Sequence, residues 1–497
     1  MTFAFRLDNT GRPLHALAVP LAITSAVTLG VSPALHPVST TEWKTVTAQA
    51  KLLDTEAWIM GGSGLPIPPQ SYMDALFARY IDPATPFFDG QPSYPVDKTN
   101  PLFTPEGLYP NSGVKSLELD PSIAQGVTIL QNTINQQIAE GNNLVVLGYS
   151  QSSTISTIVM RDLLALPADQ QPTADQLSFV LLGAPNNPNG GLFERFNVLT
   201  DGSYPTIPSL GITFNGAIPD GTPWDTSVYT LEYDGYADFP KYPINFLADL
   251  NAVLGIIYEH VVYPSLTAEQ LGTAIELPMS EGYDGNTHYF MIPSEILPLL
   301  MPLQSIPVIG QPLYDLLEPS MRILVNLGYG SITEGWSAGP ANVATPFELF
   351  PTDLNWGEVL TALGNGAQQG WNDFVHDLSN LSFPTASDFL GTSAGDVTSF
   401  ALPSLSELAN AFSSITSTAY AALLPTADIL NALLTTAPAY SFEVFAQELA
   451  QGDIVNAIGL PIAGILGLGT LGVGFEYLAL NGAVSDITAT IQDLFTA

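Results

Sequence analysis

One serine of the chain lies in a pattern that suits a nucleophile. Ser150 is the centre of the pentapeptide GYSQS (148–152), which follows an apolar run at 144–147 and precedes a helix-like segment at 151–166. This order of strand, tight turn and helix is that of the nucleophile elbow, whose pattern is G-x-S-x-G. Ser152 replaces the second glycine but is also small. We therefore predict that Ser150 is a catalytic nucleophile rather than a serine that only caps the following helix.

A serine nucleophile also needs two N–H groups that bind the negative oxygen of the tetrahedral intermediate. The residue after the nucleophile, Gln151, supplies one of them in this type of site. The strand-like run 57–60 leads into GGSG (61–64), where glycines let backbone N–H groups turn toward a ligand. We expect the second N–H to come from Gly62 or Ser63. A phosphate-binding loop is disfavoured, because the stretch has neither the lysine of a P-loop nor a complete G-x-G-x-x-G.

The base that activates such a serine is a histidine. The chain has five histidines, and two of them, His260 and His288, lie in the part of the chain that carries the serine. His260 directly follows a helix-like segment, and His288 lies in a strand-like run. We prefer His260 and keep His288 as the alternative. The other three lie in the N-terminal segment or in the C-terminal tail: His15, His36 and His376.

The acid of the triad should lie between the serine and the histidine in the chain. The strand-like run 228–233 ends in a turn that carries Asp234 and Asp238. A carboxylate just beyond the carboxyl end of a strand is where an α/β fold presents functional groups. We prefer Asp238, because Asp-Phe-Pro marks the turn after the strand, whereas Asp234 is close enough to belong to the strand itself.

The elements that must position these residues alternate along residues 41–338 in the order typical of an α/β fold with a mostly parallel sheet. After 339–351 the composition changes to Ala, Leu, Ser, Thr and Gly, which predicts a mainly helical C-terminal region at 339–497. Candidate strands are 57–60, 144–147, 179–182 and 228–233, and candidate helices are 122–140, 151–166, 245–258 and 294–301.

The composition limits the classes of function. Eleven Lys and Arg against 47 Asp and Glu give a net charge of −36, so a nucleic-acid partner is not expected. The chain has no cysteine and no H-x-x-x-H or Cys/His cluster, so we expect neither a metal site nor another cofactor.

Two apolar segments suggest contact with a membrane or passage through one. Residues 1–40 combine a basic start with an apolar middle, which predicts a signal peptide or membrane anchor, and therefore an exported or cell-envelope protein. The uncharged segment 454–475 is long enough to span a bilayer. However, Pro461 and several glycines make it a poor helix, so a buried or membrane-surface segment is at least as good an interpretation.

Several motifs in one order resemble the PE-PPE domain hydrolases, bacterial envelope proteins related to cutinases in the α/β-hydrolase superfamily. The resemblance covers about 58–329 and implies a serine esterase or acyltransferase acting on fatty-acyl esters, with Ser150 as nucleophile and Asp238 as acid. It also places a cutinase-like His-x-x-Tyr at 260–263, which favours His260. The motifs are TPEGLYPNSGVKSLELDPSIAQGV, VVLGYSQSS, YDGYADFP, THYFMIPSEILPLLMPL and RILVNLGYG.

Two other functions stay open on the sequence. A sugar or glycolipid acceptor in place of water would make the protein an acyltransferase of the cell envelope. The low charge density and the glycine-rich tail also suit a surface interaction protein that has lost activity, although every triad role has a candidate in the right order.

Overall fold

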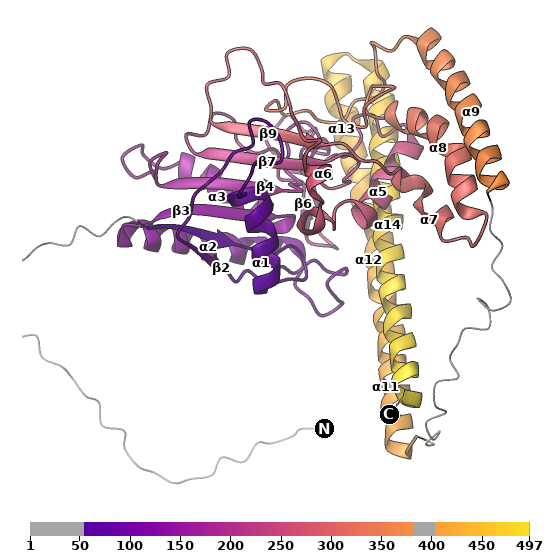
Figure 1. Ribbon diagram of the computed structural model, residues 1–497, viewed down its shortest axis with the longest axis horizontal. Helices are drawn as coiled ribbons and strands as arrows, with labels where there is room; N and C mark the ends of the chain where they lie inside the picture. The colour runs from indigo at the N-terminus through magenta and orange to yellow at the C-terminus, as the bar shows by residue number, and fades with distance from the viewer. Residues whose placement is uncertain (1–53, 381–402, 497) are drawn as a thin grey trace, which may run out of the picture. The chain divides into compact units, whose positions relative to one another are not determined.

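The computed structural model describes residues 54–380 and 403–496, so the predicted export segment 1–40 lies outside the described residues. A seven-stranded sheet lies at the centre, in the order β2-β1-β3-β4-β7-β9-β8 (Figure 1). All neighbouring strands are parallel except the pair β8 and β9 at one edge. The strands are β1 (Thr55–Ile59), β2 (Lys98–Pro101), β3 (Asn143–Tyr149), β4 (Leu177–Leu182), β7 (Asp225–Leu231), β8 (Ile275–Glu276) and β9 (Thr287–Ile292), with β5 (Thr206–Ile207) and β6 (Ile212–Thr213) as a separate antiparallel pair.

Helices cover both faces of the sheet because the central strands are apolar on both sides. In β3, Leu144 and Val146 belong to one buried cluster, and Val145 and Leu147 belong to the other. The first cluster is covered by α2 (Leu119–Glu140) and α3 (Gln151–Leu164), and the second by α1 (Gln70–Leu76), η1 (Phe77–Ile81) and α6 (Ala268–Leu271). The predicted fold class, an α/β-hydrolase fold with a mostly parallel sheet, is confirmed.

One predicted helix, 294–301, is wrong. The chain there forms a loop, the short turn η3 (Pro298–Leu300) and then α7 (Met301–Gln304). Pro298 and Pro302 have no N–H and fix their own backbone, so this stretch cannot continue as one regular helix. The remaining helices of this part are α4 (Leu192–Arg195), α5 (Phe246–Tyr258), η2 (Tyr263–Ser265) and α8 (Gly310–Asn326).

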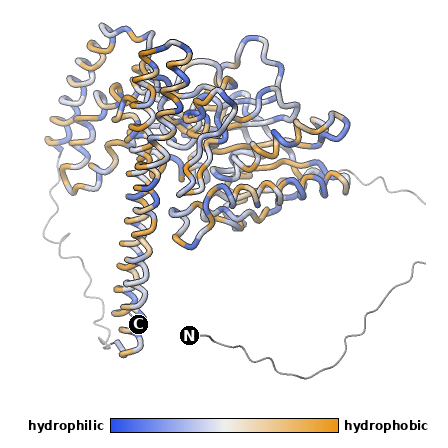
Figure 2. The backbone as a smooth tube through the Cα atoms, turned by 180° about the vertical axis from the view of Figure 1, so that it is seen from behind, coloured by the Kyte–Doolittle hydropathy of each residue, from blue (hydrophilic) through white to orange (hydrophobic). Residues whose placement is uncertain are grey.

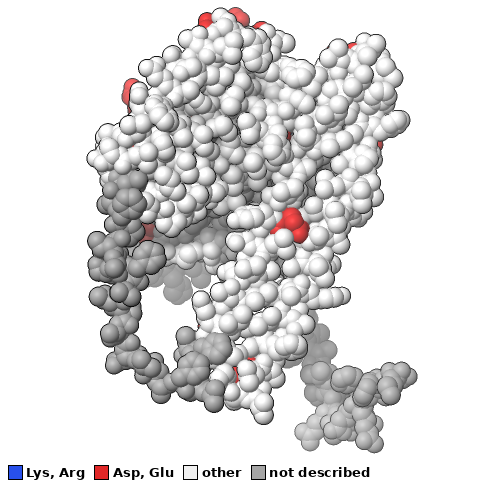
Figure 3. Space-filling view, turned by 90° about the vertical axis from the view of Figure 1, so that its right-hand side faces the viewer, with Lys and Arg blue, Asp and Glu red and all other residues white. Residues whose placement is uncertain are grey.

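The C-terminal region is helical and packs on the sheet domain, and residues 52–497 form one compact unit. In Figure 1 its yellow end, α14, crosses beside α5 and then extends away from the sheet together with α11. In Figure 2 hydrophobic residues, coloured orange, recur along this extended part between near-white and blue ones. The face shown in Figure 3 has few acidic side chains. Its helices are α9 (Trp356–Ser379), α11 (Leu405–Ala421), α12 (Leu423–Asn431), η4 (Ala432–Thr436), α13 (Ala437–Gln451) and α14 (Ile454–Thr496).

The segment 454–475 is helical throughout, contrary to the expectation that its proline and glycines would make a poor helix. Tertiary packing outweighs the low helix propensity here. A Cβ at Gly467 would lie 2.8 Å from Cζ of Phe196, and one at Gly474 would overlap Val253, so the glycines let α14 approach the sheet domain closely. By length and composition, α14 is the described helix that could cross a membrane, and 39% of its most apolar window is buried inside the protein.

Candidate active site

The predicted elbow is present between β3 and α3. Ser150 has φ +59° and ψ −118°, a strained backbone conformation for a residue with a side chain, and its N–H donates to Leu182 O at 2.9 Å. A Cβ at Gly148 would lie 2.6 Å from Ser152 O, so only glycine fits at that position. The strain and the close packing together hold the Ser150 side chain at the carboxyl edge of the parallel strands.

Ser152, the departure from the usual second glycine, makes contacts that a glycine cannot make. Its hydroxyl donates to Gly61 O at 2.7 Å and accepts from the N–H of Tyr149 at 2.8 Å. The residue is completely buried. Ser152 therefore ties the elbow directly to the glycine-rich loop after β1.

His260 lies against Ser150, as the preferred interpretation expected. Its Nε2 is 2.8 Å from Ser150 Oγ, and its backbone carbonyl accepts a hydrogen bond from Tyr149 OH. The ring stacks on Tyr149 at 5.3 Å between centroids and meets the edge of Tyr236 at 4.7 Å. The aromatic contacts on both sides restrict how the imidazole can turn.

For the acid, the structure corrects the expected choice of Asp238. Asp234 is the carboxylate at His260, with its two oxygens 2.9 and 2.8 Å from Nδ1. It is fully buried, and it also accepts hydrogen bonds from Tyr263 OH at 2.8 Å and from the N–H of Tyr236 at 3.0 Å. These partners fix the position of the carboxylate, from which it can orient the imidazole.

The reason for the error lies in the end of the strand. β7 ends at Leu231, before the expected position, and Tyr233 has φ +66° where the chain turns. Asp234 is therefore already beyond the strand. The N–H of Asp238 donates back to Asp234 O, which carries the Asp238 side chain away from the histidine and toward the N–H of Tyr233 at 3.0 Å.

Asp238 and the alternative base His288 have other surroundings. Burial raises the pKa of Asp238, and the buried guanidinium of Arg195 opposes this shift. Arg195 in turn donates to backbone carbonyls of Phe239 and Thr345, so its guanidinium ties these two loops together. His288 lies half-exposed at the start of β9, where its Nδ1 is 2.8 Å from Glu276 Oε1.

The three predicted oxyanion-hole residues meet beside Ser150. A Cβ at Gly62 would lie 3.3 Å from Cβ of Ser150, and Ser63 Oγ donates to Gln151 Oε1 at 3.0 Å. Gln151 is also fixed from its other end, by donation from Nε2 to Ser122 Oγ at 2.6 Å. Within the described part of the chain, the backbone N–H groups of Gly62, Ser63 and Gln151 have no hydrogen-bond acceptor. They are therefore free to bind an oxyanion.

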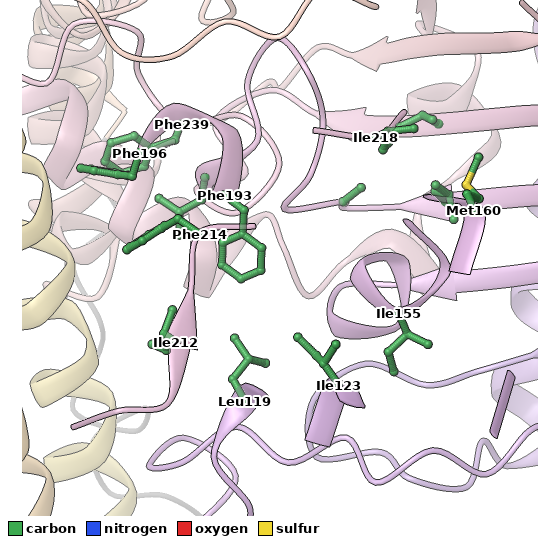
Figure 4. Packing of buried hydrophobic residues seen from close by; sticks show 14 of the residues in the cluster. Leu119, Ile123, Ile155, Met160, Phe193, Phe196, Ile212, Phe214, Ile218 and Phe239 are labelled. Carbon is green, nitrogen blue, oxygen red and sulfur yellow. The ribbon is translucent and has the colours of Figure 1, made fainter. Parts of the chain in front are cut away.

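Two hollows meet at Ser150. The larger covers about 870 Å³ of space, part of it open to solvent, and is lined mainly by apolar side chains, without any Asp, Glu, Lys or Arg. Leu119, Phe193, Ile212 and Phe214 lie around this space (Figure 4). The smaller hollow is lined by His260 among others. The two hollows share Ser63, Leu108, Ser150 and Tyr236.

Sequence reasoning missed most of the residues that line the larger hollow. Nine of them lie in the C-terminal region, for which the sequence predicted helices but no role at the site. A signal was present, because these residues recur at the three- and four-residue spacing of a helix face. They are Ile429, Ala432, Leu433, Thr436, Ala437, Leu468, Leu471, Gly472 and Phe475. No group of three or more His, Asp or Glu side chains that could hold a metal ion occurs in the described residues.

Comparison with known proteins agrees with this architecture. The PE-PPE domain matches residues 95–330. The chain is 42% identical to the uncharacterized PPE family protein PPE28 of Mycobacterium tuberculosis over 472 residues, which are 90% of this chain and 69% of that protein. It is 47% identical to the esterase PE16 of the same organism over 299 residues, which are 60% of this chain and 52% of that protein.

A more distant relative is the diacyltrehalose acyltransferase Chp2 of the same organism, which is 22% identical over 293 residues, covering 58% of this chain and 77% of that protein. The chain thus spans about two thirds of PPE28 and about half of PE16. The match to PPE28 over nine tenths of the chain, with the PE-PPE domain match across the site, shows that the chain belongs to the PE-PPE domain family.

Proposed function

We propose that this protein is a serine esterase that hydrolyses fatty-acyl esters through an acyl-enzyme, with Ser150 as nucleophile, His260 as base and Asp234 as acid. The observation that carries the proposal is the unbroken line of hydrogen bonds from Ser150 Oγ through His260 to Asp234, at the mouth of an uncharged apolar cavity. The relative named an esterase supports the same class of reaction.

The geometry supports the following sequence of steps. His260 Nε2 takes the proton of Ser150 Oγ as this oxygen bonds to the ester carbonyl carbon, while Nδ1–H donates to Asp234. The N–H of Gln151, with that of Gly62 or Ser63, binds the resulting oxyanion. The imidazolium then returns its proton to the alcohol oxygen as the C–O bond breaks, which leaves the acyl group on Ser150. Water, deprotonated by His260, releases the carboxylic acid and restores the serine.

The two hollows suggest how the ester lies. The leaving alcohol must be within reach of His260, which lines the smaller hollow. The acyl chain then occupies the larger, uncharged hollow on the Gln151 side. Burial of an apolar chain there contributes about 0.8 kcal/mol for each CH₂ group, so the site favours fatty-acyl over acetyl esters.

Acyl transfer is the second candidate, favoured by the relative named a diacyltrehalose acyltransferase. In this version a sugar hydroxyl in the smaller hollow replaces water and accepts the acyl group. The chemistry at Ser150 is the same in both cases, and the acceptor decides the product. Incubation of the enzyme with an acyl ester and trehalose, with mass spectrometry of the products, separates acylated sugar from free acid.

We also propose that the protein acts outside the cytoplasm, at or near a lipid surface. The apolar middle of residues 1–40 supports export. Large apolar side chains on the C-terminal helices support contact with lipid, since Leu405 is 86% exposed and Phe412 is 73% exposed. Localisation of a tagged full-length chain by cell fractionation tests this, and a chain found only in the cytosol would contradict it.

The experiment that tests the proposed function compares the wild-type protein with Ser150→Ala and a control, Ser156→Ala. Ser156 is also a buried serine of α3, but its hydroxyl bonds only the helix carbonyl of Ser152. Hydrolysis of p-nitrophenyl esters and labelling by a fluorophosphonate probe are measured. We expect Ser150→Ala to lose at least about 10³-fold in kcat/KM and all labelling, and the control to retain both. A folded wild-type protein that neither hydrolyses nor labels would favour the inactive interaction protein instead.

A further inference from the structure

Two helical stripes of the C-terminal region face the larger hollow. On α14, Leu468, Leu471, Gly472 and Phe475 follow the spacing i, i+3, i+4, i+7, which places them on one face of the helix. The second stripe runs along the end of α12 and through η4 and consists of Ile429, Ala432, Leu433 and Thr436, at the same spacing. Both stripes lie outside residues 95–330, the part that matches the PE-PPE domain.

The sheet domain forms the opposite wall of the same hollow. Leu119 at the start of α2, Phe193 of α4 and the β6 region with Ile212 and Phe214 point toward this space (Figure 4). The same hollow also reaches Ser150. A chain attached to Ser150 would therefore run between the sheet domain on one side and the C-terminal helices on the other.

Hydrogen bonds fix the C-terminal wall at the edge of the hollow. Asp428, directly before the second stripe, accepts from Tyr109 OH at 2.6 Å through its carboxylate and from Ser209 Oγ at 2.8 Å through its carbonyl. On the other side, Tyr440 OH donates to Phe196 O at 3.0 Å. The second stripe is thus anchored to the sheet domain at both of its ends, which fixes its position at the hollow.

We propose that the two stripes are the acyl-chain subsite of the enzyme and that Gly472, which has no side chain, sets how long a chain the subsite accepts. The inference rests on the proposed function and adds the residues that select the acyl group. An uncharged, unbranched fatty-acyl chain is the chemical class that fits, because the lining has no Asp, Glu, Lys or Arg. The few polar side chains of the lining lie mostly next to Ser150, so the remainder of the hollow is apolar. In this proposal a short acyl group reacts without reaching the stripes, whereas a long one extends along them to Gly472.

A matched pair of glycines on α14 makes the test specific. A Cβ at Gly472 would lie only 3.3 Å from Cγ2 of Ile429, so the two stripes close on each other at this point, whereas a Cβ at Gly469 would have nothing within 4 Å. Gly469 lies one turn away on the same helix and does not line the hollow. Leucine at either position raises helix propensity equally. A difference in chain-length selectivity between Gly472→Leu and Gly469→Leu therefore comes from the hollow and not from helix propensity.

The experiment measures kcat/KM for p-nitrophenyl acetate, octanoate and palmitate. We expect Gly472→Leu to lower the palmitate-to-acetate ratio at least about tenfold, since a side chain of several CH₂ groups displaces as many from the substrate. Gly469→Leu is expected to keep the wild-type ratio within about twofold. The same ratio in both variants would overturn the proposal. If Gly472→Leu lowers the melting temperature strongly, Gly472→Ala serves as the milder variant, with a smaller shift in the same direction.

A binding measurement separates failure of this inference from failure of the proposed function. In the Ser150→Ala background, palmitate is titrated against a fluorescent fatty acid bound to the protein. We expect Gly472→Leu to weaken palmitate binding at least about tenfold and Gly469→Leu to leave it unchanged. Wild-type protein without esterase activity would contradict the proposed function alone. Equal palmitate affinity in the two glycine variants would contradict the subsite, whatever the activity.

Discussion

Two regions of the molecule meet at Ser150 and differ in how they hold their residues in place. In the sheet domain, Ser150, His260 and Asp234 are joined by hydrogen bonds of 2.8–2.9 Å. In the C-terminal region, the residues at the hollow are apolar apart from one threonine and form helix stripes. Hydrogen bonds depend on short distances and angles, whereas apolar contacts depend on area and volume. We therefore expect the first region to determine whether an ester reacts and the second to determine which acyl chain it carries.

This contrast gives each region its own signature in kinetics. A change in the sheet domain that disturbs the reacting groups should lower kcat for every chain length by a similar factor, because all esters pass through the same transition state. A change in the helix stripes should alter the ratio between long and short chains, because only long chains touch them. Changes at Asp234, Ser152 and Leu471 test this division, and each of the three has a control in the same turn or helix.

The largest effect is expected for Asp234→Asn. The amide cannot hold the imidazole in the required tautomer or stabilise the imidazolium, so kcat should fall about 10²- to 10⁴-fold for acetate and palmitate esters alike. Asp238→Asn is the comparison, since this carboxylate accepts from Tyr233 N–H and does not contact His260. It should affect chiefly the melting temperature. Steady-state kinetics and thermal unfolding measure the two effects. A larger loss of kcat in Asp238→Asn than in Asp234→Asn would contradict the assignment of Asp234 as the acid.

A smaller but still uniform loss is expected for Ser152→Ala. This change removes the link between the elbow and Gly61 O, next to the predicted oxyanion-hole residues, and small displacements of such donors lower kcat by about 10-fold to 10²-fold. Thr157→Val is the control, because that hydroxyl bonds only the helix carbonyl of Ser153. The loss should be the same for acetate and octanoate esters. A loss confined to octanoate would place Ser152 in the acyl subsite instead.

In the C-terminal region, Leu471→Ala should change selectivity instead of rate. Leu471 is buried at the hollow. Val473, two positions further on the same helix, is 67% exposed, so Val473→Ala is the control variant. The wider hollow should raise the ratio of branched-chain to straight-chain acyl esters about threefold to tenfold, the worth of one or two CH₂ groups. Equal ratios in the two variants would contradict the role of the stripe.

The pH dependence of stability should also belong to the sheet domain, which contains the buried carboxylates. Burial raises the pKa of Glu106 to about 8 from an ordinary 4.5. The folded protein therefore keeps this proton while the unfolded chain loses it, so stability is full below about pH 4.5 and falls as the pH rises to about 8. The loss from this group alone is about 3 kcal/mol at pH 7 as an upper value.

Glu106→Gln removes this titration and keeps an acceptor for the Thr104 hydroxyl, which donates to Glu106 Oε1. We expect the variant to melt at a higher temperature than the wild type at pH 8, with a much smaller difference at pH 5. Glu407→Gln, an exposed carboxylate of α11 whose pKa is lowered by its capping hydrogen bonds, is the control and should show no such gain at pH 8. Parallel melting curves of wild type and Glu106→Gln across this range would contradict the assignment.

The sequence predicted the parts of the site that depend on local pattern. The apolar run before Gly148 and the helix after Ser150 were sufficient to predict the elbow, because strand, turn and helix are contiguous in the chain. The glycines at 61–64 predicted the loop beside it for the same reason. The placement of His260 followed from the small number of histidines and from the resemblance to known hydrolases.

The choice between Asp234 and Asp238 could not be made from the sequence, because it depends on where β7 ends and how the next turn folds back. If the end of a strand shifts by a few residues, a different side chain lies at the edge of the sheet. The wall from α14 was missed for a different reason. Its glycines lower helix propensity. Packing against residues such as Phe196, some 270 positions away in the chain, stabilises the helix and places it at the hollow.

The central claim is that Ser150 carries the acyl group during turnover, and trapping the acyl-enzyme tests it most directly. Protein mixed with p-nitrophenyl octanoate is quenched in acid within the first turnovers, digested and analysed by mass spectrometry. We predict an octanoyl group on the peptide that contains Ser150, absent from Ser150→Ala and accumulating in Asp234→Asn if deacylation slows more than acylation. Turnover without any acyl adduct, or an adduct on another residue that survives in Ser150→Ala, would contradict the account.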